Sequence, residues 1–124
     1  LNEFLGKGYI CAIFICRGSC GLELKTTKIM DGYSIEDVEL GISLISKRFS
    51  DVYGIGVSFG GNQLLKFTSN IGFDFKAMSI ISAPYNIKNS IEYMEGTVYD
   101  KFYMKRLKNE CFIPNKSILE NLYN

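Results

Sequence analysis

The chain has 124 residues, of which 47% are hydrophobic and 22% charged, so it is long enough for one domain with a modest core and too apolar for a disordered protein. Its 14 basic and 13 acidic residues give a net charge of +1, which provides no electrostatic case for a nucleic-acid partner. No apolar run approaches the roughly 18 residues that indicate a membrane span.

The first part of the chain predicts a strand and then a helix. Tyr9–Ile15 is a continuous apolar run rich in β-branched residues, typical of a strand buried on both faces of a parallel sheet. Arg17 and Gly18 end this run, and a polar loop follows. Ser34, with Asp37 three residues later, predicts a capping box at the start of a helix. The apolar stripe of that helix is Ile35, Val38, Ile42, Ile45 and Phe49.

The middle of the chain continues this alternation of strands and helices. A second strand, a second helix and a third strand are predicted at Val52–Val57, Gly60–Asn70 and Ala77–Ile81. The order β-α-β-α-β implies parallel strands joined by right-handed crossovers, and hence a partial, doubly wound α/β sheet. Ligands bind beyond the carboxyl ends of such strands. We therefore expect Arg17, Ser58 and residues 82–85 to meet at one edge of the sheet.

Residues 85–124 have a different character, with short helical stripes rich in large aromatic side chains and accompanied by basic residues. Three interpretations are open: a solvated basic face on ordinary amphipathic helices, a helical cap over an apolar substrate pocket, or association with a membrane surface. We expect one domain over residues 1–124, with the sheet core at about 6–84 and the cap-like helices at about 85–124.

The cysteines do not form a recognisable metal site. Cys16 and Cys20 are four positions apart, but the chain contains no histidine and no further nearby cysteine to complete a zinc site. A disulfide between these two residues would strain the loop. Reduced thiols, together with an opening that lacks signal-peptide organisation, predict an intracellular protein, cytoplasmic or membrane-associated. We expect the chain to be a fragment, because Leu1 is not an initiator methionine.

The motif Gly56-Val57-Ser58-Phe59-Gly60 carries the strongest functional signal. A G-x-S-x-G between a strand and a helix is the pattern of the nucleophile elbow of serine hydrolases, in which a tight turn presents the serine hydroxyl above the sheet. We expect Gly56 and Gly60 to remove side chains that would collide where the strand and the helix nearly touch. The first free N–H groups of the helix suit a negative charge that develops on a carbonyl oxygen.

Two other interpretations of the motif compete with the nucleophile elbow. A glycine-rich phosphate loop at a helix N-terminus lacks its Lys-Ser/Thr ending here, because Asn62 and Gln63 follow the glycines. A dinucleotide site would need an acidic residue after the third strand, where Ser82 stands. The phosphate loop and the dinucleotide site are two forms of one alternative, a phosphate-binding turn. The other alternative is a turn with a purely structural role.

Several further segments resemble one family of proteins. Gly8-Tyr9 followed by Arg17-Gly18 resembles the strand and His-Arg-Gly passage of α/β-hydrolase fold proteins, with Cys16 in place of the histidine. The stretch from Gly56 to Lys66 is very similar to the elbow of the lipase and esterase branch named as embryogenesis-associated or medium-chain-ester hydrolases. Residues 81–85 (ISAPY) are similar to the next strand end of that branch.

The resemblance implies specific roles for the elbow residues. Ser58 would be the nucleophile and the backbone N–H of Phe59 one oxyanion-hole donor, with no metal or organic cofactor. The implied substrates are carboxylic esters, in particular acylglycerols or other lipids. The second oxyanion donor, the acid and the histidine would lie outside residues 1–124, so we expect the isolated chain to be inactive. A catalytically silent binding protein and a thioesterase-like or peptidase-like acyl hydrolase are the alternatives.

Overall fold

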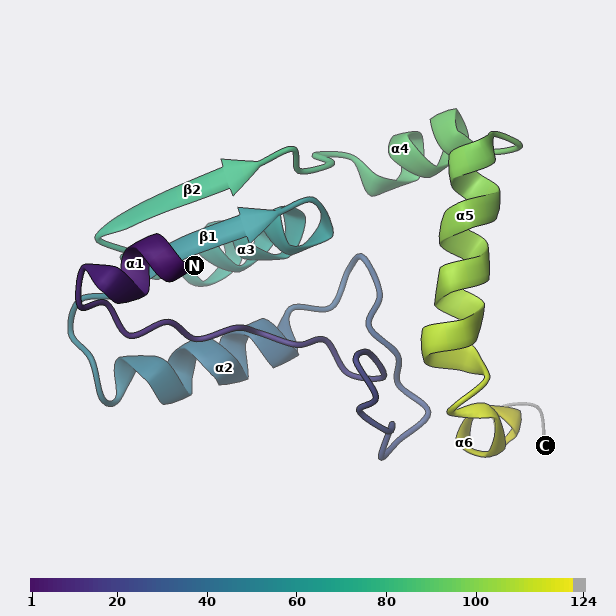
Figure 1. The fold of residues 1–124 in the computed structure, drawn as a ribbon, viewed down its shortest axis with the longest axis horizontal. Helices are drawn as coiled ribbons and strands as arrows, with labels where there is room; N and C mark the ends of the chain where they lie inside the picture. Colours follow the sequence, from purple (N-terminus) through teal and green to yellow (C-terminus); the bar gives the residue numbers. More distant parts are fainter. Residues whose placement is uncertain (122–124) are drawn as a thin grey trace.

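The computed structural model describes residues 1–121 and alternates helices with two strands (Figure 1). In chain order the elements are α1 (Asn2–Gly6), α2 (Glu36–Ser46), β1 (Tyr53–Val57), α3 (Phe59–Ile71), β2 (Ala77–Ile81), α4 (Ile87–Met94), α5 (Val98–Leu107), the π-helix η1 (Lys108–Phe112) and α6 (Lys116–Glu120). The chain is therefore a mixed α/β protein, as the sequence predicts.

The centre of the fold is a parallel β-α-β unit. Strands β1 and β2 pair in register from Tyr53 with Ala77 to Val57 with Ile81, and α3 forms the crossover between them. Both strands lie within one residue of their predicted bounds. Gly72, with a φ of 72°, ends α3 in the left-handed conformation that glycine adopts without strain.

The hydrophobic core lies between α2, α3 and one face of the sheet. Val38 and Ile42 of α2 pack with Leu64 and Phe67 of α3, and partly buried aromatic side chains before β2 complete the cluster. Phe67 is the most deeply buried of these side chains, with 2% of its surface exposed. The predicted apolar stripe of α2 is thus confirmed in its central part.

The first predicted strand does not form. Residues 9–15 run as an extended segment without strand pairing among the described residues (Figure 1). The ring of Phe14 lies against Gly41 of α2, while Ile10 and Ile13 are 76% and 70% exposed. An apolar, β-branched run favours the extended conformation, but a strand also needs a neighbouring strand with which it forms hydrogen bonds. Strand β1 pairs with β2 and forms no ladder with residues 9–15.

The doubly wound sheet is also incomplete, because one face of β1 is about half exposed, with the ring of Tyr9 against Tyr53. Tyr53, Ile55 and Val57 point away from α3 and are 51–57% exposed. The whole chain exposes 9489 Å², whereas a compact monomer of this mass exposes about 6,700 Å². The structure therefore contains one helix-covered face of an α/β sheet and no full hydrolase core among the described residues.

The region after β2 forms helices between Ile87 and Glu120, as predicted, and residues 122–124 of the predicted cap lie outside the described residues. Asn86 caps α4 by accepting a hydrogen bond from the N–H of Asn89, and Thr97 caps α5 by accepting one from the N–H of Asp100. Tyr93 and Tyr99 are 86% and 69% exposed. In Figure 1, α5 stands apart from the sheet. None of the helices in residues 1–121 combines the length and the apolar character needed to cross a membrane.

Candidate active site

Ser58 lies in the sharp turn between the last residue of β1 and the first residue of α3. Its φ is 52° and its ψ is −124°, a combination that non-glycine residues rarely adopt because the side chain crowds the backbone. The residue is solvent-exposed. Strained, exposed residues at the ends of strands are common at functional sites.

Hydrogen bonds hold the backbone of Ser58 on both sides. Its N–H donates to the carbonyl of Ile81 at 2.9 Å, which extends the β1–β2 ladder by one residue. Its carbonyl accepts from the N–H groups of Gly61 and Asn62 at 3.0 and 3.2 Å, which starts α3. Its hydroxyl forms no hydrogen bond within residues 1–121, so the oxygen stays available for another partner.

Glycines permit the close approach of β1 and α3, but the pair differs from the predicted one. A Cβ on Gly56 would lie 2.6 Å from the Cα of Gly61, and a Cβ on Gly61 would lie 2.8 Å from the Cβ of Ala83. A Cβ on Gly60 would meet no atom within 4 Å. The prediction that Gly60 relieves a collision is therefore wrong, because this residue points away from the sheet and the next glycine faces it.

The first turn of α3 provides unbonded donors directly after Ser58. The N–H groups of Phe59 and Gly60 occupy the first two positions of the helix, where no intrahelical acceptor exists. The positive end of the helix dipole adds to their effect on a nearby anion. The oxyanion role predicted for the Phe59 amide fits this position and stays a prediction.

The residues after β2 lie beside Ser58. Since Val57 pairs with Ile81, Ser58 and Ser82 directly follow paired residues on neighbouring strands. Ser82 is also exposed and has a φ of 50°. The structure thus brings Ser58 and the 82–85 segment to one edge, as the topology predicts.

Polar side chains of α3 connect the adjacent loops to the helix, a role that was not predicted from the sequence. Asn62 donates to the carbonyl of Pro84 at 2.7 Å, and Gln63 donates to the carbonyl of Asp31 at 3.3 Å. Lys66 donates to the carbonyl of Gly32. A signal was present in the sequence, because polar residues on the core-facing side of a predicted helix need buried partners.

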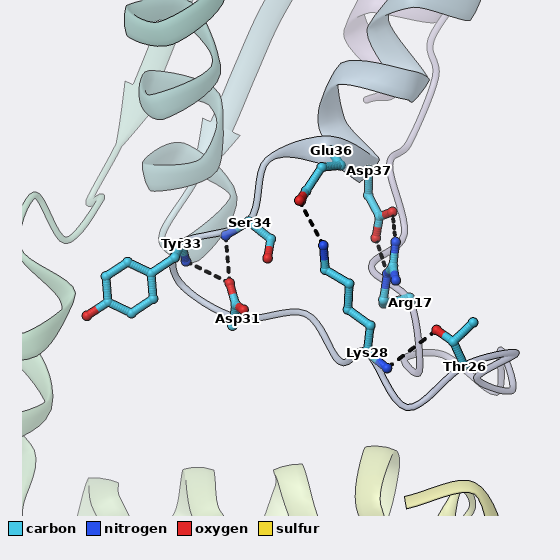
Figure 2. Close-up of polar contacts among 8 residues, drawn as sticks. All are labelled: Arg17, Thr26, Lys28, Asp31, Tyr33, Ser34, Glu36 and Asp37. Carbon is cyan, nitrogen blue, oxygen red and sulfur yellow. Dashed lines mark hydrogen bonds and ion pairs between the residues drawn. The ribbon is translucent and has the colours of Figure 1, made fainter. Parts of the chain in front are cut away.

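Arg17 does not join this edge and instead pairs with Asp37 (Figure 2). The guanidinium donates to both carboxylate oxygens, and these side chains are 30% and 21% exposed. The guanidinium lowers the pKa of Asp37, and the carboxylate raises the pKa of Arg17. The pair ties the loop after residue 16 to the first turn of α2, which agrees with a structural role for Arg17.

The predicted capping box at the start of α2 is wrong. Ile35 is the N-cap residue, and no side chain caps the helix. Asp31 instead accepts hydrogen bonds from the N–H groups of Tyr33 and Ser34 at 2.8 and 2.6 Å (Figure 2), and these bonds lower its pKa. The Ser34/Asp37 spacing fits the box, but Arg17 competes for the carboxylate with a stronger, charged interaction.

The described residues do not complete a catalytic set around Ser58. The chain contains no histidine, Asp31 and Asp37 are engaged as described above, and Asp74 is exposed in the connection before β2. Burial raises the pKa of the Cys16 and Cys111 thiols, which disfavours the nucleophilic thiolate. No group of three or more potential ligands that could hold a metal ion occurs in residues 1–121.

Comparison with known proteins gives one informative similarity. The chain is 27% identical over 115 residues to the protein abhd-3.2 of Caenorhabditis elegans. The aligned part covers 86% of this chain and 31% of that protein, so the chain spans about a third of the length of its relative. The relative is named as a member of an α/β-hydrolase domain family, which supports the general α/β-hydrolase class for this chain. No family model matches the chain, and no solved structure matches it.

Proposed function

We propose that this chain supplies the nucleophile of a serine acyl hydrolase, and that Ser58 carries the acyl group during turnover. The conformation of Ser58 is the main support. Its φ of 52° between a strand and a helix, with an exposed side chain, is the arrangement that presents a hydroxyl to a substrate in nucleophile elbows. The similarity to an abhd protein supports the same class independently.

The proposed reaction has two steps. In the first, the Ser58 Oγ attacks the acyl carbon and gives up its proton to a base, while the N–H of Phe59 stabilises the oxyanion. The alcohol leaves with that proton, and an acyl-serine remains. In the second step a water molecule attacks the acyl-serine, which releases the carboxylic acid and restores the hydroxyl.

In this proposal a histidine base and its acid partner come from residues outside positions 1–124, which contain no histidine. Ser58 alone is then an incomplete site. We accordingly propose that the 124-residue chain hydrolyses esters only as part of the complete protein.

Carboxylic esters with apolar acyl chains, such as acylglycerols, are the proposed substrates. The support comes from the residues of the elbow that resemble the lipase and esterase branch, and from the apolar surface near the candidate site. Val57 and Ile81, at the ends of β1 and β2, are 57% and 48% exposed. In this proposal the helices after β2 cover the acyl chain as a cap.

An ester panel tests this function. The complete protein and its Ser58→Ala variant are assayed on p-nitrophenyl esters and thioesters of graded acyl length, with phosphatidylcholine and acylglycerol emulsions as lipid substrates. We expect turnover of esters that depends on Ser58 and peaks at medium or long chains. Preference for thioesters would identify a thioesterase instead. An equal rate in both proteins would contradict the proposal and favour a catalytically silent binding protein.

A further inference from the structure

The turn formed by residues 82–85 is the second structural element at the edge where Ser58 lies. It begins directly after Ile81, which pairs with Val57. The N–H of Ser58 donates to the carbonyl of Ile81 at 2.9 Å. A displacement of the turn would therefore change the surroundings of the Ser58 hydroxyl directly.

One side chain of α3 connects this turn to the helix. Asn62 is 3% exposed, and its Nδ2 donates to the carbonyl of Pro84 at 2.7 Å. Beyond the β1–β2 ladder, no other hydrogen bond reaches residues 82–85 in the described part of the chain. The Oδ1 of Asn62 is buried without a partner among the same residues. Within the described residues, the hydrogen bond to the Pro84 carbonyl is thus the only one that the side-chain amide of Asn62 forms.

Packing and backbone conformation show that the turn is held tightly. Ala83 lies so near α3 that a Cβ on Gly61 would come within 2.8 Å of its Cβ. Ser82 adopts a φ of 50°, which a serine keeps only when its neighbours stabilise that conformation. Loss of the amide donor would leave the Pro84 carbonyl unpaired and remove one of these restraints.

We propose that Asn62 is a positioning residue that fixes the 82–85 turn and thereby shapes the space in which an acyl group meets the Ser58 hydroxyl. This inference rests on the proposed hydrolase function. Asn62 acts through the turn and does not touch the reacting atoms. A displacement of about 1 Å at a reacting centre lowers rates by roughly 100-fold, so a single buried hydrogen bond is sufficient for a large effect.

Gln63 provides a matched control for this inference. It is the next residue of α3, it is 2% exposed, and it donates the same kind of amide hydrogen bond to the carbonyl of Asp31 instead of the turn. The variants are Asn62→Asp, Asn62→Ala, Gln63→Glu and Gln63→Ala in the complete protein. Each pair changes a buried amide in the same way, so a general loss of stability affects both positions.

The first measurement is the rate at which a fluorophosphonate probe labels Ser58, at a temperature where all variants are folded. We expect both Asn62 variants to be labelled about 10- to 100-fold more slowly than the wild type and both Gln63 variants within about 3-fold of it. The ratio of the Asn62→Asp rate to the Asn62→Ala rate should rise as the pH falls, because a protonated carboxyl again donates to the Pro84 carbonyl. Equal losses at both positions would overturn the inference.

The second measurement does not depend on the reaction of Ser58. Hydrogen exchange of the Ser58 amide, whose N–H donates to the carbonyl of Ile81 directly before the turn, is compared in Asn62→Ala, Gln63→Ala and wild-type protein. We expect this amide to exchange about 10-fold faster in Asn62→Ala alone, because a displaced turn weakens that hydrogen bond. Unchanged exchange would overturn the positioning role. Faster exchange without any labelling of the wild type would leave that role intact and contradict the hydrolase proposal.

Discussion

Apolar side chains are buried in the β1–α3–β2 unit, whereas many apolar side chains of the segments on either side of it are exposed to solvent. In the unit, Gly56 and Gly61 allow backbones to touch, and Phe67 is 2% exposed. Residues 9–15 and helix α5 also carry large apolar side chains, yet Ile10 and Phe102 are 76% and 59% exposed. Apolar character therefore produces burial only where the chain also supplies the opposing surface.

The largest expected effect is on the rate of ester hydrolysis, because the candidate site has a nucleophile in Ser58 while the chain contains no histidine. The purified 124-residue chain should hydrolyse p-nitrophenyl esters no faster than its Ser58→Ala variant. Loss of the histidine base of a serine triad lowers turnover by about 10⁶-fold. A clear Ser58-dependent rate would show that a different base, such as a lysine, acts within the chain.

Phenylalanine substitutions in the two regions test the comparison directly. Phe67→Ala should lower the free energy of unfolding by about 3–5 kcal/mol, because it creates a cavity in the core. Phe102→Ala on α5 should change it by no more than about 0.5 kcal/mol, as is usual for exposed positions. Urea denaturation of both variants measures these changes. A comparable cost at Phe102 would show that α5 packs against a further surface.

Two neighbouring glycines of α3 should respond differently to substitution by alanine. Gly61→Ala places a methyl group 2.8 Å from the Cβ of Ala83, and the overpacking should cost about 1–3 kcal/mol of unfolding free energy. Gly60→Ala meets open space and should be neutral or stabilise the helix by up to about 1 kcal/mol. Thermal unfolding of both variants distinguishes the positions. Similar destabilisation by both would contradict the orientation of the elbow described here.

A smaller effect is expected at the ion pair between Arg17 and Asp37. Asp37→Asn should lower the free energy of unfolding by about 1–2 kcal/mol near neutral pH, because it replaces a charge-assisted hydrogen bond. The pKa of Asp37 is lowered in the folded protein, so the stabilisation is complete above the ordinary aspartate pKa of about 3.9 and is lost as the pH falls through the folded value.

Urea denaturation from pH 7 to pH 3 checks the sign of this effect. The difference in unfolding free energy between wild type and Asp37→Asn should be constant near neutral pH and decrease on acidification below about pH 4. A difference that grows as the pH falls would contradict the assigned pairing.

The sequence predicts β1, α3 and β2 well because their signals are local. A short apolar strand, a glycine-rich turn and a helical apolar stripe adjoin one another, and each supports the next. The position of Ser58 follows from the same signals. The roles of Gly60 and Gly61 could not be separated, because the difference depends on which glycine faces the sheet after the turn.

The failed predictions depend on partners far along the chain. Residues 9–15 have strand propensity, but the sequence does not show which neighbour would pair with them. The position of Asp37 in the sequence fits a capping box, but in the structure its carboxylate pairs with Arg17, twenty positions away. Asn62 was visible as part of a motif, yet its contact with Pro84 becomes evident only when both strand ends are placed side by side.

The most direct measurement of the central claim locates a covalent adduct. The complete protein is treated with a fluorophosphonate, and the modified peptide is identified by mass spectrometry. We predict a single adduct on Ser58 that is absent from the Ser58→Ala variant and from heat-denatured protein. Modification at another residue, or none under conditions that label a control serine hydrolase, would contradict the assignment of Ser58 as the nucleophile.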